Sequence, residues 1–166
     1  TVKELILQQE SNTKCTAFMY TTWHSLNVDV FKYYWGFINK TLTKNETVEH
    51  LKTRNMFNFT AFHFATWNNR SAEIGTEIFN LTAEIYSKTL ETEDFRKLIF
   101  NGKSTDLLFL RSLVNTARSE VCYLVADFIQ NLFNENEDSR RTLNDTLAKN
   151  KINVSLTTHC KNNKNF

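Results

Sequence analysis

Residues 105–133, which read TDLLFLRSLVNTARSEVCYLVADFIQNLF, decide the fold class. Apolar side chains recur there at alternating steps of four and three, at Leu110, Val114, Ala117, Val121, Leu124 and Phe128. This spacing is typical of one face of an α-helix, and further apolar residues beside it widen the face. The stretch therefore predicts one long central helix, whose apolar face packs against neighbours on two sides.

The rest of the chain extends this prediction to an all-α, single-domain helical bundle spanning residues 1–166. The sequence has no proline and only three glycines, so it lacks the residues that tight β-turns require. We expect about five to seven helices in all. A short aromatic helix is expected to be capped at Asp29, and another helix to follow Ser71. From about residue 151 the chain is polar and basic, which predicts a solvated tail.

Charge and hydropathy exclude several classes of protein. The net charge is only +2, so no overall positive field is available to attract nucleic acid. No apolar run approaches the length of about 18 residues that a membrane span needs. Hydrophobic residues make up 41% and charged residues 23% of the chain, an ordinary balance for a globular domain. We therefore expect neither nucleic acid nor a membrane span.

Asn-x-Ser/Thr sequons predict the compartment. There are seven of them, about twice the three or four expected by chance in a chain this rich in Asn, Ser and Thr. The acceptors are Asn39, Asn45, Asn58, Asn69, Asn80, Asn144 and Asn153. The enrichment favours a secreted, extracellular glycoprotein directed by a signal peptide, although accidental sequons in an Asn-rich chain are the alternative. Asn58 and Asn80 are the weaker candidates, because each lies between two apolar residues.

The three cysteines, Cys15, Cys122 and Cys160, are too few for a disulfide framework and have no metal-ligand spacing. In an oxidising compartment one disulfide bond can form, in any of three ways. The remaining thiol is then buried or bonded to another molecule. A monomer and a disulfide-linked homodimer both remain open.

Motifs for catalysis, cofactors and metals do not stand out. The four histidines have no HExxH or i, i+4 arrangement, and the chain has no GxSxG elbow or glycine-rich phosphate loop. His63, between Phe62 and Phe64, is expected to be structural and not a ligand. We expect no enzyme, no cofactor and no catalytic residue. A catalytic site assembled from distant residues would leave no such local pattern, so an enzyme stays the third hypothesis.

Aromatic residues gather in two patches. The first holds Tyr33, Tyr34, Trp35 and Phe37, and the second holds Phe57, Phe59, Phe62, Phe64 and Trp67. The second patch cannot lie on one narrow helical face. Such residues form a core, line a cavity for an apolar ligand, or contact a protein partner.

Protein recognition is the first function hypothesis: a cytokine-like ligand, a decoy or an immune modulator that acts on an extracellular protein. The polar back of the predicted long helix, which no sequon interrupts, provides the candidate contact residues Arg111, Arg118 and Glu120. This interpretation rests on architecture, which does not by itself determine function.

An extracellular carrier of small hydrophobic ligands such as lipids is the alternative hypothesis. Its cavity would lie between helices and be lined by Tyr34, Trp35, Phe57, Phe62, Phe64 and Trp67. The presence of an interior void would favour this carrier, because protein interiors normally pack without one.

Overall fold

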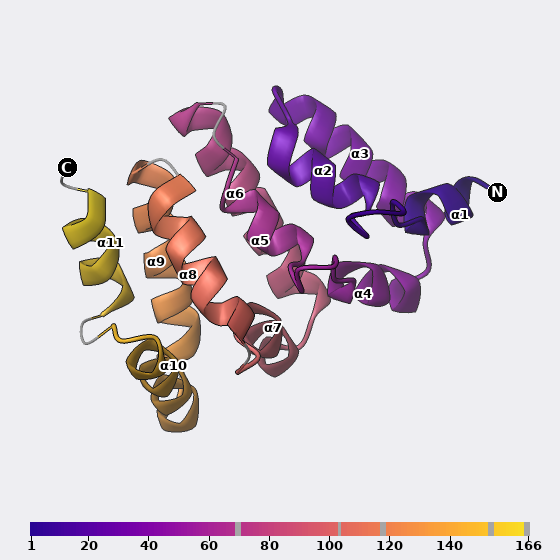
Figure 1. Ribbon diagram of the computed structural model, residues 1–166. Helices are drawn as coiled ribbons and strands as arrows, with labels where there is room; N and C mark the ends of the chain where they lie inside the picture. The colour runs from indigo at the N-terminus through magenta and orange to yellow at the C-terminus, as the bar shows by residue number, and fades with distance from the viewer. Residues whose placement is uncertain (69–70, 103, 117–118, 153–154, 165–166) are drawn as a thin grey trace.

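The computed structural model describes residues 1–68, 71–102, 104–116, 119–152 and 155–164, which form an all-helical chain (Figure 1). Over these residues there are eleven helices and one isolated β-bridge, between Gln9 and Thr16. The helices are α1 (Val2–Leu7), α2 (Ala17–His24), α3 (Val28–Thr41), α4 (Lys44–Lys52), α5 (Ala61–Ala65), α6 (Ala72–Thr89), α7 (Thr92–Ile99), α8 (Ser104–Thr116), α9 (Ser119–Phe133), α10 (Glu137–Lys149) and α11 (Leu156–Lys164). The prediction of an all-α fold is confirmed, whereas five to seven helices was too few.

The short helix α5 lies at the centre of the molecule, and all five of its residues are buried. The Phe62 ring contacts the rings of Phe79, Phe95 and Phe128, with centroids 5.0–5.9 Å apart. These rings come from α6, α7 and α9, so one aromatic cluster joins four helices. A single hydrophobic core continues from Ile6 to Cys160, which makes the chain one compact domain.

The predicted long central helix is wrong, because residues 105–133 form two helices. Helix α8 ends at Thr116 and α9 begins at Ser119, and the two run in opposite directions (Figure 1). The sequence around this point, residues 115–120, is polar except for Ala117, and a helix can end there when each half has its own apolar face to bury. Apolar side chains on both sides of the break are buried, among them Leu110, Val114, Val121 and Val125.

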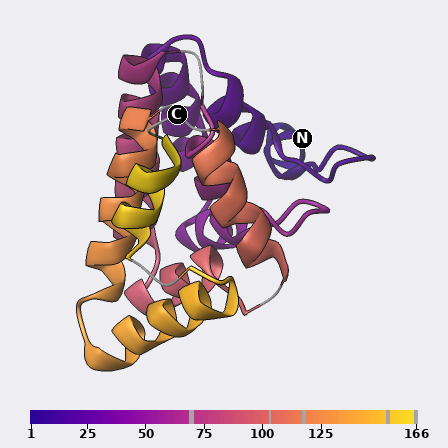
Figure 2. The same ribbon diagram turned by 60° about the vertical axis from the view of Figure 1, so that its left-hand side comes forward.

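The predicted solvated tail is also wrong. Its residues include α11, which packs along α9 and also contacts α8 (Figure 2). Leu156 and Cys160, one helical turn apart, are buried at this contact. The Thr157 hydroxyl adds a hydrogen bond to the Asp127 carboxylate on α9, at 2.9 Å. Two apolar residues at helical spacing are therefore enough to hold an otherwise polar segment against the core.

Two glycines have clear structural roles. Gly102 has φ +74° in the turn between α7 and α8, a conformation that glycine adopts readily after a helix, and its N–H donates to the buried Asp106 carboxylate. A Cβ on Gly75 would lie 2.6 Å from the Asn68 carbonyl oxygen and 3.1 Å from Val121 of α9. Gly75 therefore permits the close approach of α6 to the segment before it and to α9.

Candidate recognition surface

Helix α3 carries apolar side chains on two sides, one buried and one exposed. On its inner side Phe31 and Ile38 are buried, and the Phe31 ring lies 5.8 Å from that of Phe18 in α2. The helix begins after Asn27, whose side-chain oxygen accepts from the Asp29 N–H at 2.7 Å. The predicted cap, Asp29, is therefore wrong, because Asn27 is the N-cap. Asp29 lies in the first turn, where its negative charge interacts favourably with the positive end of the helix dipole.

The outer side of α3 exposes a row of large apolar side chains, which we call the α3 stripe. It consists of Leu26, Val30, Tyr33 and Phe37, with exposed fractions of 67%, 58%, 80% and 39%. Val30, Tyr33 and Phe37 lie on one side of α3, and Leu26 precedes them in the turn before the N-cap residue Asn27. Single exposed apolar residues are ordinary, whereas neighbouring ones form an apolar patch, which makes this stripe the candidate recognition surface.

A shallow hollow of about 390 Å³ adjoins the start of this stripe, at the turn between α2 and α3. Leu26 and Val30 form one side of it, and Tyr20 and His24 of α2 lie among its other lining residues. The hollow makes the N-terminal end of the stripe concave, which suits an inserted side chain better than a flat surface does.

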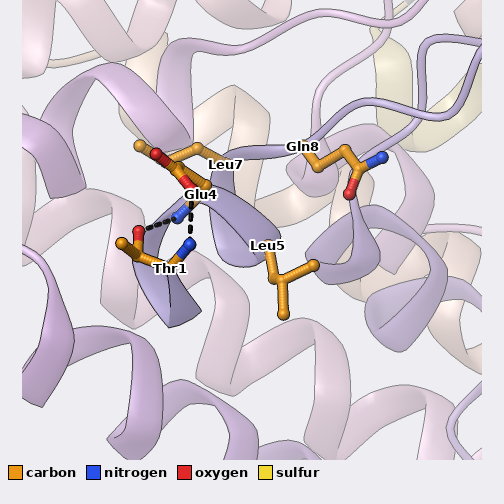
Figure 3. A pocket seen from close by; sticks show the side chains of 5 residues that line it. All are labelled: Thr1, Glu4, Leu5, Leu7 and Gln8. Atoms are coloured by element: carbon orange, nitrogen blue, oxygen red, sulfur yellow. Dashed lines mark hydrogen bonds and ion pairs between the residues drawn. The ribbon is translucent and has the colours of Figure 1, made fainter.

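A second hollow, of about 720 Å³, lies beside α1 and is lined by Thr1, Glu4, Leu5, Leu7 and Gln8 (Figure 3). Glu4 is held by the Thr1 backbone amine and hydroxyl, which form a capping box at the start of α1. Leu5 is 66% exposed. This open surface has one acidic side chain and offers no arrangement of groups for catalysis.

A third hollow, of about 380 Å³, separates α3 from α6. Trp35, Leu81 and Ile85 provide its apolar part, and Lys32 and Lys88 lie at its polar part. Lys32 forms an ion pair with Glu77 of α6 at 2.8 Å, which ties the two helices together. Asn39, a sequon acceptor, also lines this hollow, so a sugar on Asn39 would lie over it.

A polar hollow of about 370 Å³ lies between the α7–α8 turn and α10. Two acidic residues, Asp106 and Asp145, and two basic ones, Lys97 and Lys149, are among its lining residues. Burial raises the pKa of Asp106, while N–H groups of Asn101 and Gly102 oppose this by bonding its carboxylate at 3.1 and 2.9 Å. The carboxylate therefore holds the turn, and the balanced charges select no particular ion.

The sequon asparagines are mostly at the surface where the structure describes them. Asn39, Asn45, Asn80 and Asn144 are exposed, and Asn58 is half-buried. Asn69 and Asn153 lie outside the described residues. The conflict expected at Asn80 is resolved because Phe79 is buried while Leu81 is only half-buried.

The aromatic residues predicted to line a ligand cavity belong mainly to the core. Phe62, Phe64 and Trp67 are buried, and their rings contact other rings at 4.9–5.9 Å. Phe57 is 52% exposed, whereas Tyr34 and Trp35 are half-buried in α3. The six residues are thus distributed over different environments, and the central ones fill the interior themselves.

The residues predicted for partner contact lie near the α8–α9 connection. Arg111 and Glu120 are exposed, and Arg118 lies outside the described residues. Because the helix is broken there, Arg111 and Glu120 belong to two different helices and do not share one helical back. The α3 stripe was not predicted. The sequence does contain a signal for it, because apolar residues at 26, 30, 33 and 37 form a second set beside the apolar Phe31 and Ile38.

The three predicted disulfide candidates are all buried thiols. Cys15, Cys122 and Cys160 are 4% exposed or less, and no disulfide joins them in the described part of the chain. The predicted disulfide is therefore not present in this structure. A disulfide between two molecules would require one of these side chains to leave the core.

Two buried histidines differ in their hydrogen bonds. His63 accepts from the Thr60 N–H through Nδ1 at 3.1 Å and donates from Nε2 to the Ile99 carbonyl at 3.3 Å. Burial, with the nearby Arg54 charge, lowers the pKa of His63 to about 3. His50 packs against Phe18, and neither ring nitrogen has a hydrogen-bond partner in the described structure. Burial lowers the pKa of His50 to about 4.

Neither His50 nor His63 belongs to a candidate metal site in the described part of the chain. Among the described residues, no three His, Cys, Asp or Glu side chains lie close enough to hold a metal ion. Within the same residues, no helix is both long enough and apolar enough to cross a membrane. Compared with family models, curated proteins and solved structures, the chain matches none.

Proposed function

We propose that this chain is a secreted, N-glycosylated binding protein that acts by protein–protein recognition. The observation that carries the proposal is the α3 stripe, four large apolar side chains in one exposed row. Aromatic residues are favoured at the centres of protein interfaces, and Tyr33 combines a large apolar ring with a hydroxyl that tolerates water. The proposal involves no catalytic step.

The position of Asn39 supports the same surface. At 100° per residue, Asn39 lies about 120–160° round α3 from Tyr33 and Phe37. A glycan on Asn39 would therefore lie toward the hollow between α3 and α6, which Gly36 also lines, and away from Tyr33 and Phe37. This arrangement suits a glycoprotein that keeps one face bare for a partner.

Site-specific photo-crosslinking tests the proposal. A photoreactive amino acid replaces Tyr33 in the protein made by a secreting eukaryotic host, and a control protein carries it at the exposed Lys88 of α6. We expect a discrete protein adduct at position 33 and none at position 88. Unlabelled wild-type protein should compete the adduct away, whereas a Val30→Asp variant should not. Equal labelling at both positions, or none at either, would contradict recognition through this surface.

The carrier remains the alternative function, and the packed aromatic core weighs against it. A lipid-sized ligand would need the space that the Phe62 cluster occupies. Native mass spectrometry of the secreted protein, before and after deglycosylation, distinguishes the two. We expect a mass that falls on deglycosylation and contains no co-purified molecule. A bound mass of a few hundred daltons, lost on denaturation, would favour the carrier.

A further inference from the structure

We propose that the partner of the α3 stripe is a second copy of this chain, bound through α3 in antiparallel orientation. This inference rests on the proposed function, because it names the occupant of the same surface. Two identical helices can pack around a two-fold axis only if their faces are self-complementary. Helix α3 meets this requirement in the shape and charge of its exposed flank.

Four residues along one edge of the stripe provide that complementarity: Asp29, Tyr33, Gly36 and Lys40. They follow each other at steps of four, three and four, so they form one line on the helix. In an antiparallel pair, a line of residues on one copy faces the same line of the other copy. In the register where paired numbers sum to 69, Asp29 faces Lys40 of the second copy, and Tyr33 faces its Gly36.

Gly36 is otherwise difficult to explain. It lies in the middle of α3, where glycine weakens a helix relative to alanine. A Cβ built on it meets no atom of the chain within 4 Å, so the fold of one copy does not require a glycine. Opposite the large ring of Tyr33 from a second copy, a residue without a side chain leaves the space that the ring needs.

The charges on this edge are available for a partner. Lys32, on the neighbouring line, is already paired with Glu77 of α6. Asp29 and Lys40 are both exposed, and neither forms an ion pair in the described part of the chain. In the antiparallel register, the Asp29 carboxylate of each copy faces the Lys40 ammonium group of the other copy. The pair of helices therefore contains two such contacts, related by the two-fold axis. A parallel pair would instead place like charges together, which disfavours it.

Tyr33 lies at the centre of this contact, and Val30 and Phe37 from both copies extend it on one side, about 60° and 40° round the helix from Tyr33. A helix of 14 residues is about 21 Å long, so the interface is small. Small interfaces bind weakly and reversibly. We therefore expect a dimer that dissociates on dilution through the micromolar range and that needs no disulfide.

Sedimentation velocity of the secreted glycoprotein over a dilution series tests this inference. Lys40→Glu and Asp29→Lys should each weaken dimerisation by about tenfold, because each places like charges opposite one another. The double variant, in which the two charges are exchanged, should restore the wild-type dissociation constant to within about threefold. Arg141→Glu on α10 is the matched control, with the same change in charge at the opposite end of the molecule (Figure 1), and should have no effect.

Gly36→Ala separates association from folding. The variant should raise the thermal midpoint of the monomer, since the added methyl group meets nothing in its own chain, and it should weaken the dimer several-fold. A dimer that resists both Lys40→Glu and Gly36→Ala would overturn the inference.

The crosslinking experiment separates this inference from the proposed function. An adduct at position 33 of twice the chain mass supports both proposals. A monomer at every concentration, together with an adduct to a different protein, overturns the self-association and leaves recognition standing. A monomer that forms no adduct overturns both.

Discussion

Phe62 and Tyr33 belong to two aromatic patches that look alike in the sequence, but the two residues lie in very different environments. Phe62 is fully buried among rings from α6, α7 and α9. Tyr33 is 80% exposed on the outer side of α3. The difference arises because α5 is enclosed by neighbouring helices, whereas α3 is covered on one side only. Aromatic content thus measures how much apolar surface a segment has, and topology decides whether its own chain covers it.

The largest expected difference between the two patches is in stability. Phe62→Ala removes a ring that joins four helices and leaves a cavity, so it should lower the free energy of unfolding by about 3–5 kcal/mol. Phe37→Ala is the matched control from the first patch, because Phe37 is 39% exposed, and it should cost much less. Urea denaturation followed by circular dichroism measures both values. Equal losses would show that the two environments are not different.

Removing one hydroxyl beside Phe62, from Tyr86 of α6, and one from Tyr33 gives a finer comparison. The Tyr86 hydroxyl donates to the Leu51 carbonyl at 2.9 Å and accepts from the Phe62 N–H at 3.3 Å, and burial raises the pKa of Tyr86 to about 12. Tyr86→Phe leaves two buried groups unsatisfied and should cost about 1–3 kcal/mol. Tyr33→Phe should leave the free energy of unfolding unchanged. A harmless Tyr86→Phe would contradict the buried hydrogen-bond network.

The pH dependence of the free energy of unfolding tests the buried side of α3. His50 contacts Phe18, which also packs against α3, and its folded pKa of about 4 lies below the unfolded value near 6.5. The unfolded state therefore binds more protons as pH falls, and stability is lost from about pH 6.5 downward. His50→Leu should reduce the loss between pH 8 and pH 5 by about 2 kcal/mol. An unchanged loss, measured by urea denaturation at both pH values, would show that His50 does not titrate on unfolding.

The smallest effect is expected on the stripe itself. Tyr33→Ala removes an exposed ring and should change the free energy of unfolding by less than about 0.5 kcal/mol. The same variant should bind a hydrophobic chromatography matrix less tightly, because it loses exposed apolar area. A large loss of stability would mean that Tyr33 supports the fold and is not available to a partner.

The fold class followed from the sequence because it depends on what the chain lacks. Without proline and with few glycines, the chain could not form the turns of a β-structure. The break between α8 and α9 could not be seen in the same way. Leu110 and Val114 before it, and Val121 and Val125 after it, keep helical spacing whether the chain continues or reverses. Apolar periodicity fixes the face of a helix but not the direction of the next one.

The surface was less predictable than the core. Arg111 and Glu120 were predicted to contact a partner because no sequon lies near them. Many surfaces lack a glycan, however, so this criterion does not single out a binding site. The α3 stripe carries a more specific signal, a second apolar row on a helix whose first row already accounts for its burial. Only the packing of α3 against α2 and α6 shows that Tyr33 and not Phe31 is the residue left outside.

The buried thiols have a consequence for local motion. Cys160 lies on the last helix, which is held mainly by α9, while Cys122 lies on α9 itself. A thiol-reactive dye can reach Cys160 once α11 detaches from α9. The rate at which Cys160 reacts would therefore record how often this helix separates from the rest of the molecule, with no engineered cysteine.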